Sequence, residues 1–351
     1  MPPVPPPLPD AREESGSEDE GKVQEPQPQS DVDEENAADV DEGINELMDT
    51  FADDEEEIDL THLRIHSTRS LNLPRFARTL QRLVLRQNQI TKIRRADFEP
   101  LTELRELDLY DNLIEHVGGL DNCTKLEVLD LSFNNIRHMS NVSHLGACHT
   151  LYFVQNKIAR VRPDDLVGPI AHSLKSLELG GNRLRSMEHL GHLQHLEELW
   201  VGKNKITSFD HIAPLQNLRV LSIQSNRITS LAGLAPLVNL EELYLSHNGV
   251  ESLAGLEHNV NLNTLDIAAN KVSSLEGIAH LSKLNQFWAN DNLLEDINHL
   301  DAYLGPARMP HLETVYLEGN PAQRKEGAAY RRKVLLALPQ IIQLDATMVR
   351  R

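Results

Sequence analysis

Most of this chain repeats one short pattern of apolar and polar positions. In one unit, Leu243 and Leu245 alternate with polar or aromatic side chains, which is the period-two pattern of a short strand. Asn248 follows, and apolar residues return at Val250 and Leu253 with a spacing that suits short helical or 3-10 turns. Each unit is therefore predicted to contain a strand, a turn and a loosely helical return.

The frame Leu-x-Leu-x-x-Asn, with another apolar residue in place of one or both leucines in some units, occurs eleven times, and seven of the ten intervals between its asparagines are 22 residues long. The other intervals are 24, 26 and 28 residues, and we expect their extra residues to form loops. So short a period predicts an α/β fold of the leucine-rich-repeat type: a right-handed solenoid of about 12 repeats, with a parallel concave sheet and short turns on the convex side. The asparagines, whose amides should bond the backbone of neighbouring turns, are Asn88, Asn112, Asn134, Asn156, Asn182, Asn204, Asn226, Asn248, Asn270, Asn292 and Asn320.

Both ends of the repeat array have atypical units. A degenerate unit at 58–79 lacks the asparagine and is predicted to cap the N-terminal end of the leucine-rich repeats at 80–320. Residues 321–351 are predicted to form the C-terminal cap, with an amphipathic helix that begins near Tyr330 and ends before Pro339.

Charge is concentrated in residues 1–57, which contain 21 Asp and Glu but only 2 Lys and Arg. With few apolar residues, this segment is predicted to be a disordered acidic tail, apart from a short helix around 44–51. A solubilising role is the simpler interpretation of the tail, although a basic protein surface could attract it. The rest of the chain is formally neutral, so the charge balance argues against nucleic acid or an anionic membrane as the main partner.

Other features exclude several classes of function. The only two cysteines, Cys123 and Cys148, fall at apolar positions and are predicted to be buried thiols of an intracellular protein. No segment is apolar enough for a signal peptide or a membrane span. The sixteen histidines lack metal-ligand spacing, and no phosphate-binding loop or nucleophile motif occurs. We therefore expect no enzyme, no metal site and no cofactor.

The residue between the two leucines of each repeat should face the middle of the concave sheet, and we refer to these residues as the central row. Four of the eleven are acidic, five are aromatic and none is basic. In chain order they are Val84, Asp108, Asp130, Tyr152, Glu178, Trp200, Ser222, Tyr244, Asp266, Trp288 and Tyr316. Aromatic residues favour strands in any protein, but an exposed row of rings more often marks an interaction site. Carboxylates between the rings would select Arg and Lys, which predicts a protein partner with a basic or mixed-charge surface.

Several local sequences also carry a family likeness. Leu-Asp-Leu-Tyr-Asp-Asn at 107–112, Leu-Tyr-Leu-Ser-His-Asn-Gly at 243–249 and Phe-Trp-Ala-Asn-Asp-Asn at 287–292 resemble the SDS-type leucine-rich-repeat regulatory subunits of protein phosphatase 1. The likeness covers about 58–351. It implies a non-enzymatic, monomeric subunit that binds the phosphatase catalytic subunit with its concave face and controls its activity or maturation. It also implies a ternary complex with phosphatase inhibitor-3, a nuclear and cytoplasmic location, and a role in mitosis and chromosome segregation.

The family's contact positions fall here on Asp130, Tyr152, Glu178, Trp200, Asp266, Gln286, Trp288 and Tyr316. Tyr244 joins them as a predicted partner-binding residue because of its place in the central row. Tyr152 and Trp200 stand where phenylalanine is usual in the family, and Gln286 stands where a glutamate is usual. The alternative function is a generic leucine-rich-repeat adaptor, similar to a tubulin cofactor or a spliceosomal protein.

Overall fold

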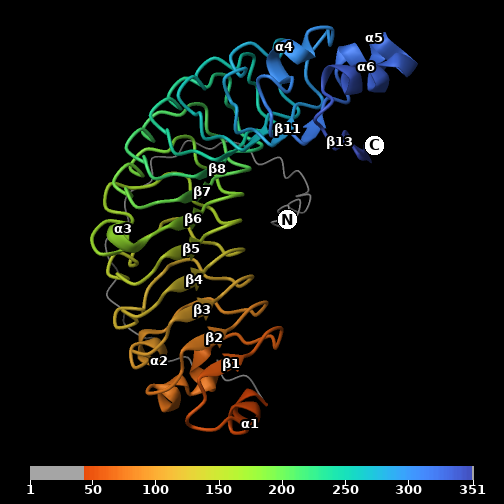
Figure 1. The fold of residues 1–351 in the computed structure, drawn as a ribbon. Coiled ribbons are helices and arrows are strands. Elements are labelled where there is room, and N and C mark those ends of the chain that lie inside the picture. The colour runs from red at the N-terminus through yellow and green to blue at the C-terminus, as the bar shows by residue number, and fades with distance from the viewer. Residues whose placement is uncertain (1–42, 350–351) are drawn as a thin grey trace, which may run out of the picture. The chain divides into compact units, whose positions relative to one another are not determined.

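The computed structural model describes residues 43–349, which form a curved stack of repeats with the sheet on its inner side (Figure 1). The predicted disorder of the first 42 residues lies outside this range. Fourteen strands form one sheet in sequence order, and all neighbouring pairs are parallel except β13 with β14. The predicted leucine-rich-repeat solenoid with a parallel concave sheet is therefore confirmed.

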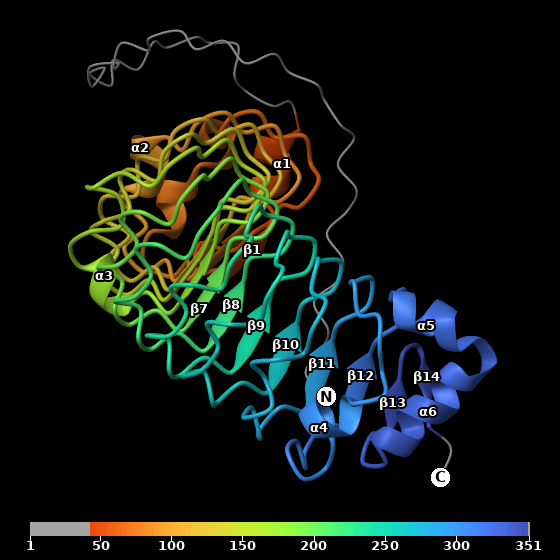
Figure 2. The same ribbon diagram turned by 90° about the horizontal axis from the view of Figure 1, so that it is seen from above.

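The strands are short, and twelve of them come from successive turns of the solenoid. These are β1 (Glu57–Asp59), β2 (Arg82–Val84), β3 (Glu106–Asp108), β4 (Val128–Asp130), β5 (Thr150–Tyr152), β6 (Ser176–Glu178), β7 (Glu198–Trp200), β8 (Val220–Ser222), β9 (Glu242–Tyr244), β10 (Thr264–Asp266), β11 (Gln286–Trp288) and β12 (Thr314–Tyr316). Figure 2 shows β7 to β12 side by side. Because the register has no slip from β1 to β12, equivalent residues of successive turns lie in straight rows across the sheet.

The repeated asparagines join each turn to the one before it. The Asn112 amide nitrogen donates to the carbonyl oxygens of Leu85 (2.9 Å) and Leu109 (3.1 Å), and its oxygen accepts from the Ile90 nitrogen (3.0 Å). Asn248 repeats the arrangement, with bonds of 2.9–3.0 Å to Leu245, Ile223 and Ile228. Each amide satisfies backbone groups that the strands leave unpaired, so the frame of the sequence becomes a hydrogen-bonded ladder.

The paired leucines fill the interior, as their alternation predicts. Leu243 and Leu245 are both fully buried. Cys123 and Cys148 are buried free thiols, which confirms the prediction from their positions, and burial raises the pKa of each to about 12. No helix among residues 43–349 is long and apolar enough to cross a bilayer.

The three longer intervals contain short helices, so the expectation of plain loops was wrong. The helices are α2 (Arg95–Phe98), α3 (Ile170–Ser173) and α4 (Leu300–Leu304), on the outer side of the curve (Figure 1). Phe98, Ile170 and Leu304 are buried beneath them. The extra residues allow a full helical turn, and its apolar side packs onto the core.

The N-terminal cap begins earlier than the sequence indicated. Helix α1 (Ile44–Met48) lies within the segment assigned to the tail, and its Ile44 and Met48 are buried in the same core as the repeats. The 3-10 helices η1 (Thr68–Leu71) and η2 (Leu73–Phe76) follow β1. Arg75 donates to the Phe51 carbonyl and pairs with Asp53 at 3.1 Å. The ordered cap therefore starts by residue 44, because two apolar side chains and these bonds hold an otherwise acidic segment.

The C-terminal cap contains α5 (Pro321–Glu326), the 3-10 helix η3 (Gly327–Ala329), α6 (Tyr330–Ala337), β13 (Gln343–Leu344) and β14 (Thr347–Met348). Asp345 follows β13 in register with Tyr316 and joins the cap to the last repeat: one carboxylate oxygen accepts from the Leu317 and Glu318 nitrogens at 2.8 and 3.0 Å, and Tyr330 OH donates to the other at 3.1 Å.

Candidate protein-binding face

The register places the whole central row on one face of the sheet. Trp200 lies beside Ser222, Ser222 beside Tyr244, Tyr244 beside Asp266 and Asp266 beside Trp288. The predicted partner-binding residues Asp130, Tyr152 and Glu178 follow one another in the same row on β4 to β6, and Tyr316 ends it on β12. Gln286 lies in the neighbouring row, two residues before Trp288.

Four of the rings form a continuous array along the C-terminal half of this row. The ring centroids of Trp200 and Tyr244 are 6.1 Å apart and nearly parallel, those of Tyr244 and Trp288 are 6.2 Å apart, and those of Trp288 and Tyr316 are 6.3 Å apart. Trp200 and Tyr244 are two turns apart, so their backbones are separated by roughly 9–10 Å. The rings must therefore lean toward each other over the residue between them.

This lean covers two members of the row that the alternation predicted to be open. Ser222 lies between Trp200 and Tyr244, Asp266 lies between Tyr244 and Trp288, and both are 3% exposed. Tyr244 itself is 7% exposed. The Asp266 carboxylate accepts hydrogen bonds from Gln224 Nε2 at 3.2 Å and from the backbone nitrogen of Ala268, just after the same strand, at 2.9 Å. Asp266 and Tyr244 are thus on the predicted face but beneath its surface, which corrects the expectation that both are directly exposed.

The polar tips of the rings are held by carboxylates two residues before them. Tyr244 OH donates to Glu242 at 2.6 Å, and Trp200 Nε1 donates to Glu198 at 3.4 Å. The equivalent residue before Trp288 is Gln286, and the indole Nε1 of Trp288 is buried with no hydrogen-bond partner among the described residues. A buried donor without an acceptor is costly, so this N–H lowers the stability of the free protein.

The N-terminal half of the row is acidic. Burial, followed by the charges of Asp130 and Glu198, raises the pKa of Glu178 to about 7. Burial also raises the pKa of Asp130, against the lowering effect of its hydrogen bonds from Ser132. The carboxylates of this half are therefore poised to gain from a cationic partner group, which would favour their charged forms.

A second aromatic cluster lies beside the acidic half and was missed from the sequence. The guanidinium of Arg86 lies 4.2 Å from the ring centroid of Tyr110, and the Tyr110 and Phe133 rings are 4.8 Å apart. Arg86 also pairs with Asp108 at 2.9 Å. Its rings come from positions after the central row, so a search of that row alone could not find them. The signal in the sequence was Phe133, an aromatic residue immediately before a ladder asparagine.

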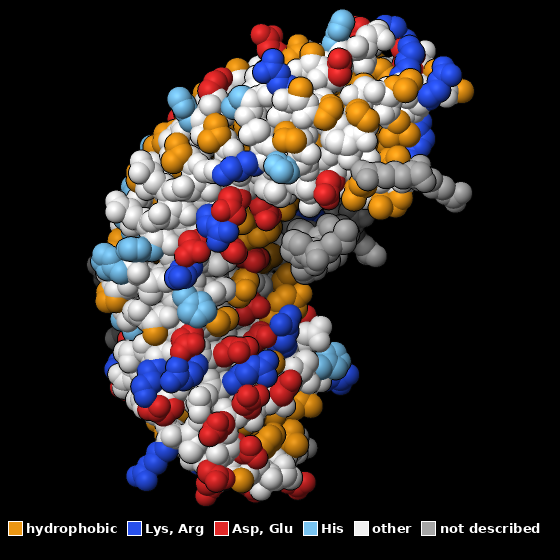
Figure 3. Space-filling model, viewed as in Figure 1, with side chains coloured by type: hydrophobic (Ala, Val, Ile, Leu, Met, Phe, Trp, Pro, Cys, Tyr) orange, Lys and Arg blue, Asp and Glu red, His pale blue; other side chains and the backbone are white. Residues whose placement is uncertain are grey.

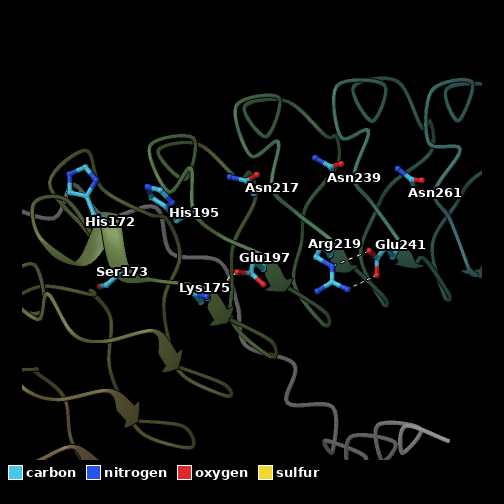
Figure 4. A pocket seen from close by; sticks show the side chains of 10 residues that line it. All are labelled: His172, Ser173, Lys175, His195, Glu197, Asn217, Arg219, Asn239, Glu241 and Asn261. Carbon is cyan, nitrogen blue, oxygen red and sulfur yellow. Dashed lines mark hydrogen bonds and ion pairs between the residues drawn. The ribbon is translucent and has the colours of Figure 1, made fainter.

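A shallow groove lies along the edge of the sheet at which the strands begin (Figure 4). Its charged wall is made of ion pairs between adjacent turns, Lys175 with Glu197 at 3.3 Å and Arg219 with Glu241 at 2.8 Å. The other wall is a row of asparagines that includes Asn239, whose amide donates to the Gln216 carbonyl at 2.9 Å. Within residues 43–349, no three His, Cys, Asp or Glu side chains converge as a metal site would require.

Known proteins share both the repeats and part of the sequence. The family model described as Leucine rich repeat matches residues 78–136, and the model described as Leucine Rich repeats (2 copies) matches 172–214 and 216–258. The protein phosphatase 1 regulatory subunit SDS22 of Saccharomyces cerevisiae is 45% identical over 102 residues, which are 29% of this chain and 30% of that protein. The protein phosphatase 1 regulatory inhibitor subunit PPP1R7 homolog of Arabidopsis thaliana is 35% identical over 181 residues, 45% of this chain and 54% of the relative.

The chain therefore has the leucine-rich-repeat fold, and part of its sequence is similar to regulatory subunits of protein phosphatase 1. The resemblance stated from the sequence is thereby confirmed. The matched stretches span about half or less of these relatives' own lengths. Among solved structures, an internalin of Listeria monocytogenes has a TM-score of 0.63 at 23% identity and covers 88% of this chain and 94% of its own. That likeness concerns the fold alone.

Proposed function

We propose that this protein is a non-catalytic regulatory subunit that binds the catalytic subunit of protein phosphatase 1 through its concave face. The observation that carries the proposal is the ring array from Trp200 to Tyr316, together with the acidic half of the same row. The relatives support it, because their names describe regulatory subunits of that phosphatase.

The two halves of the row suit a folded protein partner. Large rings with few rotatable bonds are typical binding anchors. The carboxylates around Glu178 select Arg or Lys and prefer the bidentate geometry of Arg. Eleven strand spacings of roughly 4.8 Å give an arc of about 53 Å, close to the diameter of roughly 50 Å expected for a globular domain of about 300 residues.

The decisive experiment is a titration of the purified phosphatase catalytic subunit against the full chain and two variants. We expect Trp288→Ala combined with Asp266→Asn to weaken binding strongly while the thermal midpoint stays close to that of the wild type. Asparagine keeps the hydrogen-bond acceptor that Ala268 and Gln224 use. Leu336→Ala on α6 is the control, because this leucine is 74% exposed but lies on the cap. Unchanged affinity in the double variant would contradict the concave-face assignment.

A simpler measurement separates the proposal from the adaptor alternative. Wild-type protein immobilised at low salt should retain the catalytic subunit. Absence of retention there would favour an adaptor similar to a tubulin cofactor or a spliceosomal protein.

We extend the proposal to the biology that the resemblance implies. The complex would control the activity or maturation of the phosphatase, admit phosphatase inhibitor-3 as a third component, and act in the nucleus and cytoplasm during mitosis and chromosome segregation. A phosphatase assay with and without the full chain, followed by size-exclusion chromatography with the inhibitor, tests the first two statements and the monomeric state of the free protein. Imaging of a tagged chain through mitosis tests the others.

A further inference from the structure

The edge at which the strands end carries a row of four basic side chains. Each follows a ladder asparagine in one of four successive turns: Lys157, Arg183, Lys205 and Arg227. Their backbone nitrogens bond the preceding turn in equivalent ways, at 2.8–2.9 Å, so the four residues are in register. At roughly 4.8 Å per turn the row spans about 14 Å. We refer to these four residues as the basic rim.

The basic rim has no counter-ion within the part of the chain that the structure describes. Among residues 43–349, none of the four side chains forms an ion pair or a side-chain hydrogen bond. The sequence contains no Asp or Glu from 131 to 163, a stretch that includes Lys157, and Arg137, Arg160 and Arg185 lie three or four residues after the ladder asparagines of their own turns. Like charges on adjacent strands repel one another, so this arrangement destabilises the fold slightly.

The opposite edge shows that the same repeat geometry can pair its charges. There Lys175 and Arg219 each face a glutamate of the next turn (Figure 4). Arg105 pairs with Glu127 and Lys125 with Glu103 in the same way. Figure 3 shows Lys and Arg side chains lying beside Asp and Glu side chains over the middle repeats. The unpaired basic rim is therefore not a consequence of the repeat itself.

His138, in the turn before Lys157, lies among other basic groups. Arg162 lies within hydrogen-bond distance of its Nε2, at 2.8 Å. Since a guanidinium can only donate, the imidazole accepts at this nitrogen and is neutral. Burial, and then the nearby Arg162 and Arg160, lower the pKa of His138. These arginines add positive charge to the four residues of the basic rim, to which they do not themselves belong.

We propose that the basic rim is a second docking surface, separate from the concave face, that takes an acidic segment of a protein partner. Nucleic acid fits less well, for two reasons. No aromatic side chain lies within the rim to stack a base, and the carboxylates of Asp130 and Glu178 in the adjoining row would repel a continuous phosphate backbone. In a protein segment, by contrast, the acidic residues can be confined to the part that contacts the rim, so that none lies close to Asp130 and Glu178.

Two variants with equal change of net charge test the proposal on the full chain. Arg183→Glu with Arg227→Glu reverses two exposed rim charges that lie two turns apart. Lys175→Glu with Arg219→Glu reverses two exposed charges at the same spacing on the opposite edge. The probe is a fluorescent oligo-glutamate peptide, titrated at low and high salt. The rim variant should bind it about tenfold more weakly or worse, and the control should bind within about twofold of wild type, because the attraction is local.

Three results would overturn the proposal. Equal losses in both variants would show a general effect of net charge, and no peptide binding by the wild type would show that the rim holds no acidic chain. Tighter binding of oligouridylate, lost in the rim variant alone, would assign the rim to nucleic acid. Thermal midpoints of both variants show whether either has unfolded. None of these measurements involves the phosphatase, so their outcome is independent of the proposed function.

Discussion

The two halves of the concave face use the same backbone for different physical purposes. From β3 to β6 the central row carries Asp108, Asp130 and Glu178, and burial raises the pKa of the last two. From β7 to β12 it carries four rings with centroids 6.1–6.3 Å apart. The charges of the acidic half attract a partner over distances up to about a Debye length. The rings of the aromatic half stabilise a complex only when their apolar surface is buried in direct contact with the partner.

This difference predicts a division of labour in binding. Charges guide a partner toward the face and influence mainly the association rate, while buried rings influence mainly the dissociation rate. The acidic half should therefore set speed and orientation, and the aromatic half should set the lifetime of the complex. Five measurements test this division of labour between the two halves.

The largest effect should be the same in both halves, because they share one type of core. Leu129 lies under the acidic half, Leu243 lies under the aromatic half, and both are fully buried. Each Leu→Ala change should lower the free energy of unfolding by about 2–5 kcal/mol. Chemical denaturation measures this free energy. A negligible change in either variant would show that the buried leucine does not stabilise that half of the solenoid.

Removal of a ring should shorten the lifetime of the complex. We expect Trp200→Ala or Trp288→Ala to cost about 2–4 kcal/mol of binding to the phosphatase catalytic subunit, mostly as faster dissociation and with little dependence on salt. The rings meet through Tyr244, so the double variant should lose less than the sum of the two single changes. Trp288→Phe is the matched control that keeps a ring. If the losses of binding free energy were additive and depended on salt, the rings would not act as one coupled array.

The stability of the acidic half should depend on pH. In the folded state the pKa of Glu178 rises from its ordinary 4.5 to about 7, so the folded chain holds a proton that the unfolded chain releases. Stability is therefore lost as pH rises through this window. Glu178→Gln should stabilise the protein by about 1–3 kcal/mol at pH 8 and leave it unchanged at pH 4. Thermal unfolding at both pH values checks this, with the exposed Glu276→Gln as control.

A charge removed from the acidic half should slow association. Asp130→Asn keeps the acceptor used by Ser132 N at 2.8 Å but removes the negative charge. We expect a loss of about 1 kcal/mol, mostly in the association rate, that disappears at high salt. Stopped-flow mixing at two ionic strengths provides the measurement. A change confined to dissociation would place Asp130 among the anchors instead.

The last prediction concerns Gln286, which stands where a glutamate is usual in the family. Gln286→Glu places a carboxylate two residues before Trp288, where Glu198 accepts from Trp200 and Glu242 accepts from Tyr244. The new acceptor should hold the indole N–H and stabilise the free protein by about 0.5–1.5 kcal/mol. Indole fluorescence and thermal unfolding report on it. An unaltered Trp288 environment would show that the glutamate does not reach the ring.

Part of the face could be predicted from the sequence, because one row follows from strictly local rules. Alternation decides that Trp200, Tyr244 and Trp288 point the same way, and a constant interval between asparagines decides that they line up. The Arg86, Tyr110 and Phe133 cluster could not be found by that rule. Its members belong to positions at the strand ends, where the direction of a side chain depends on the turn.

Other differences have a similar origin in packing. The composition of 1–57 predicted a disordered tail with a short helix around 44–51, but the sequence did not indicate that Ile44 and Met48 of this helix are buried in the core of the repeats. The long intervals predicted loops, yet α2, α3 and α4 pack an apolar side onto that same core. In each case local composition was outweighed by burial against residues distant in the chain.

The sequence alone determined the solenoid, the hydrogen-bonded ladder and the composition of the concave row, since each depends on spacings within a few tens of residues. Only the tertiary structure decided that the rings close over Ser222 and Asp266. It also decided that, within residues 43–349, the Trp288 N–H lacks an acceptor and the basic rim has no counter-ion, whereas charges at the opposite edge are paired. These features depend on contacts between turns, because the rotamer of each side chain is set by the neighbours that the repeat brings close to it.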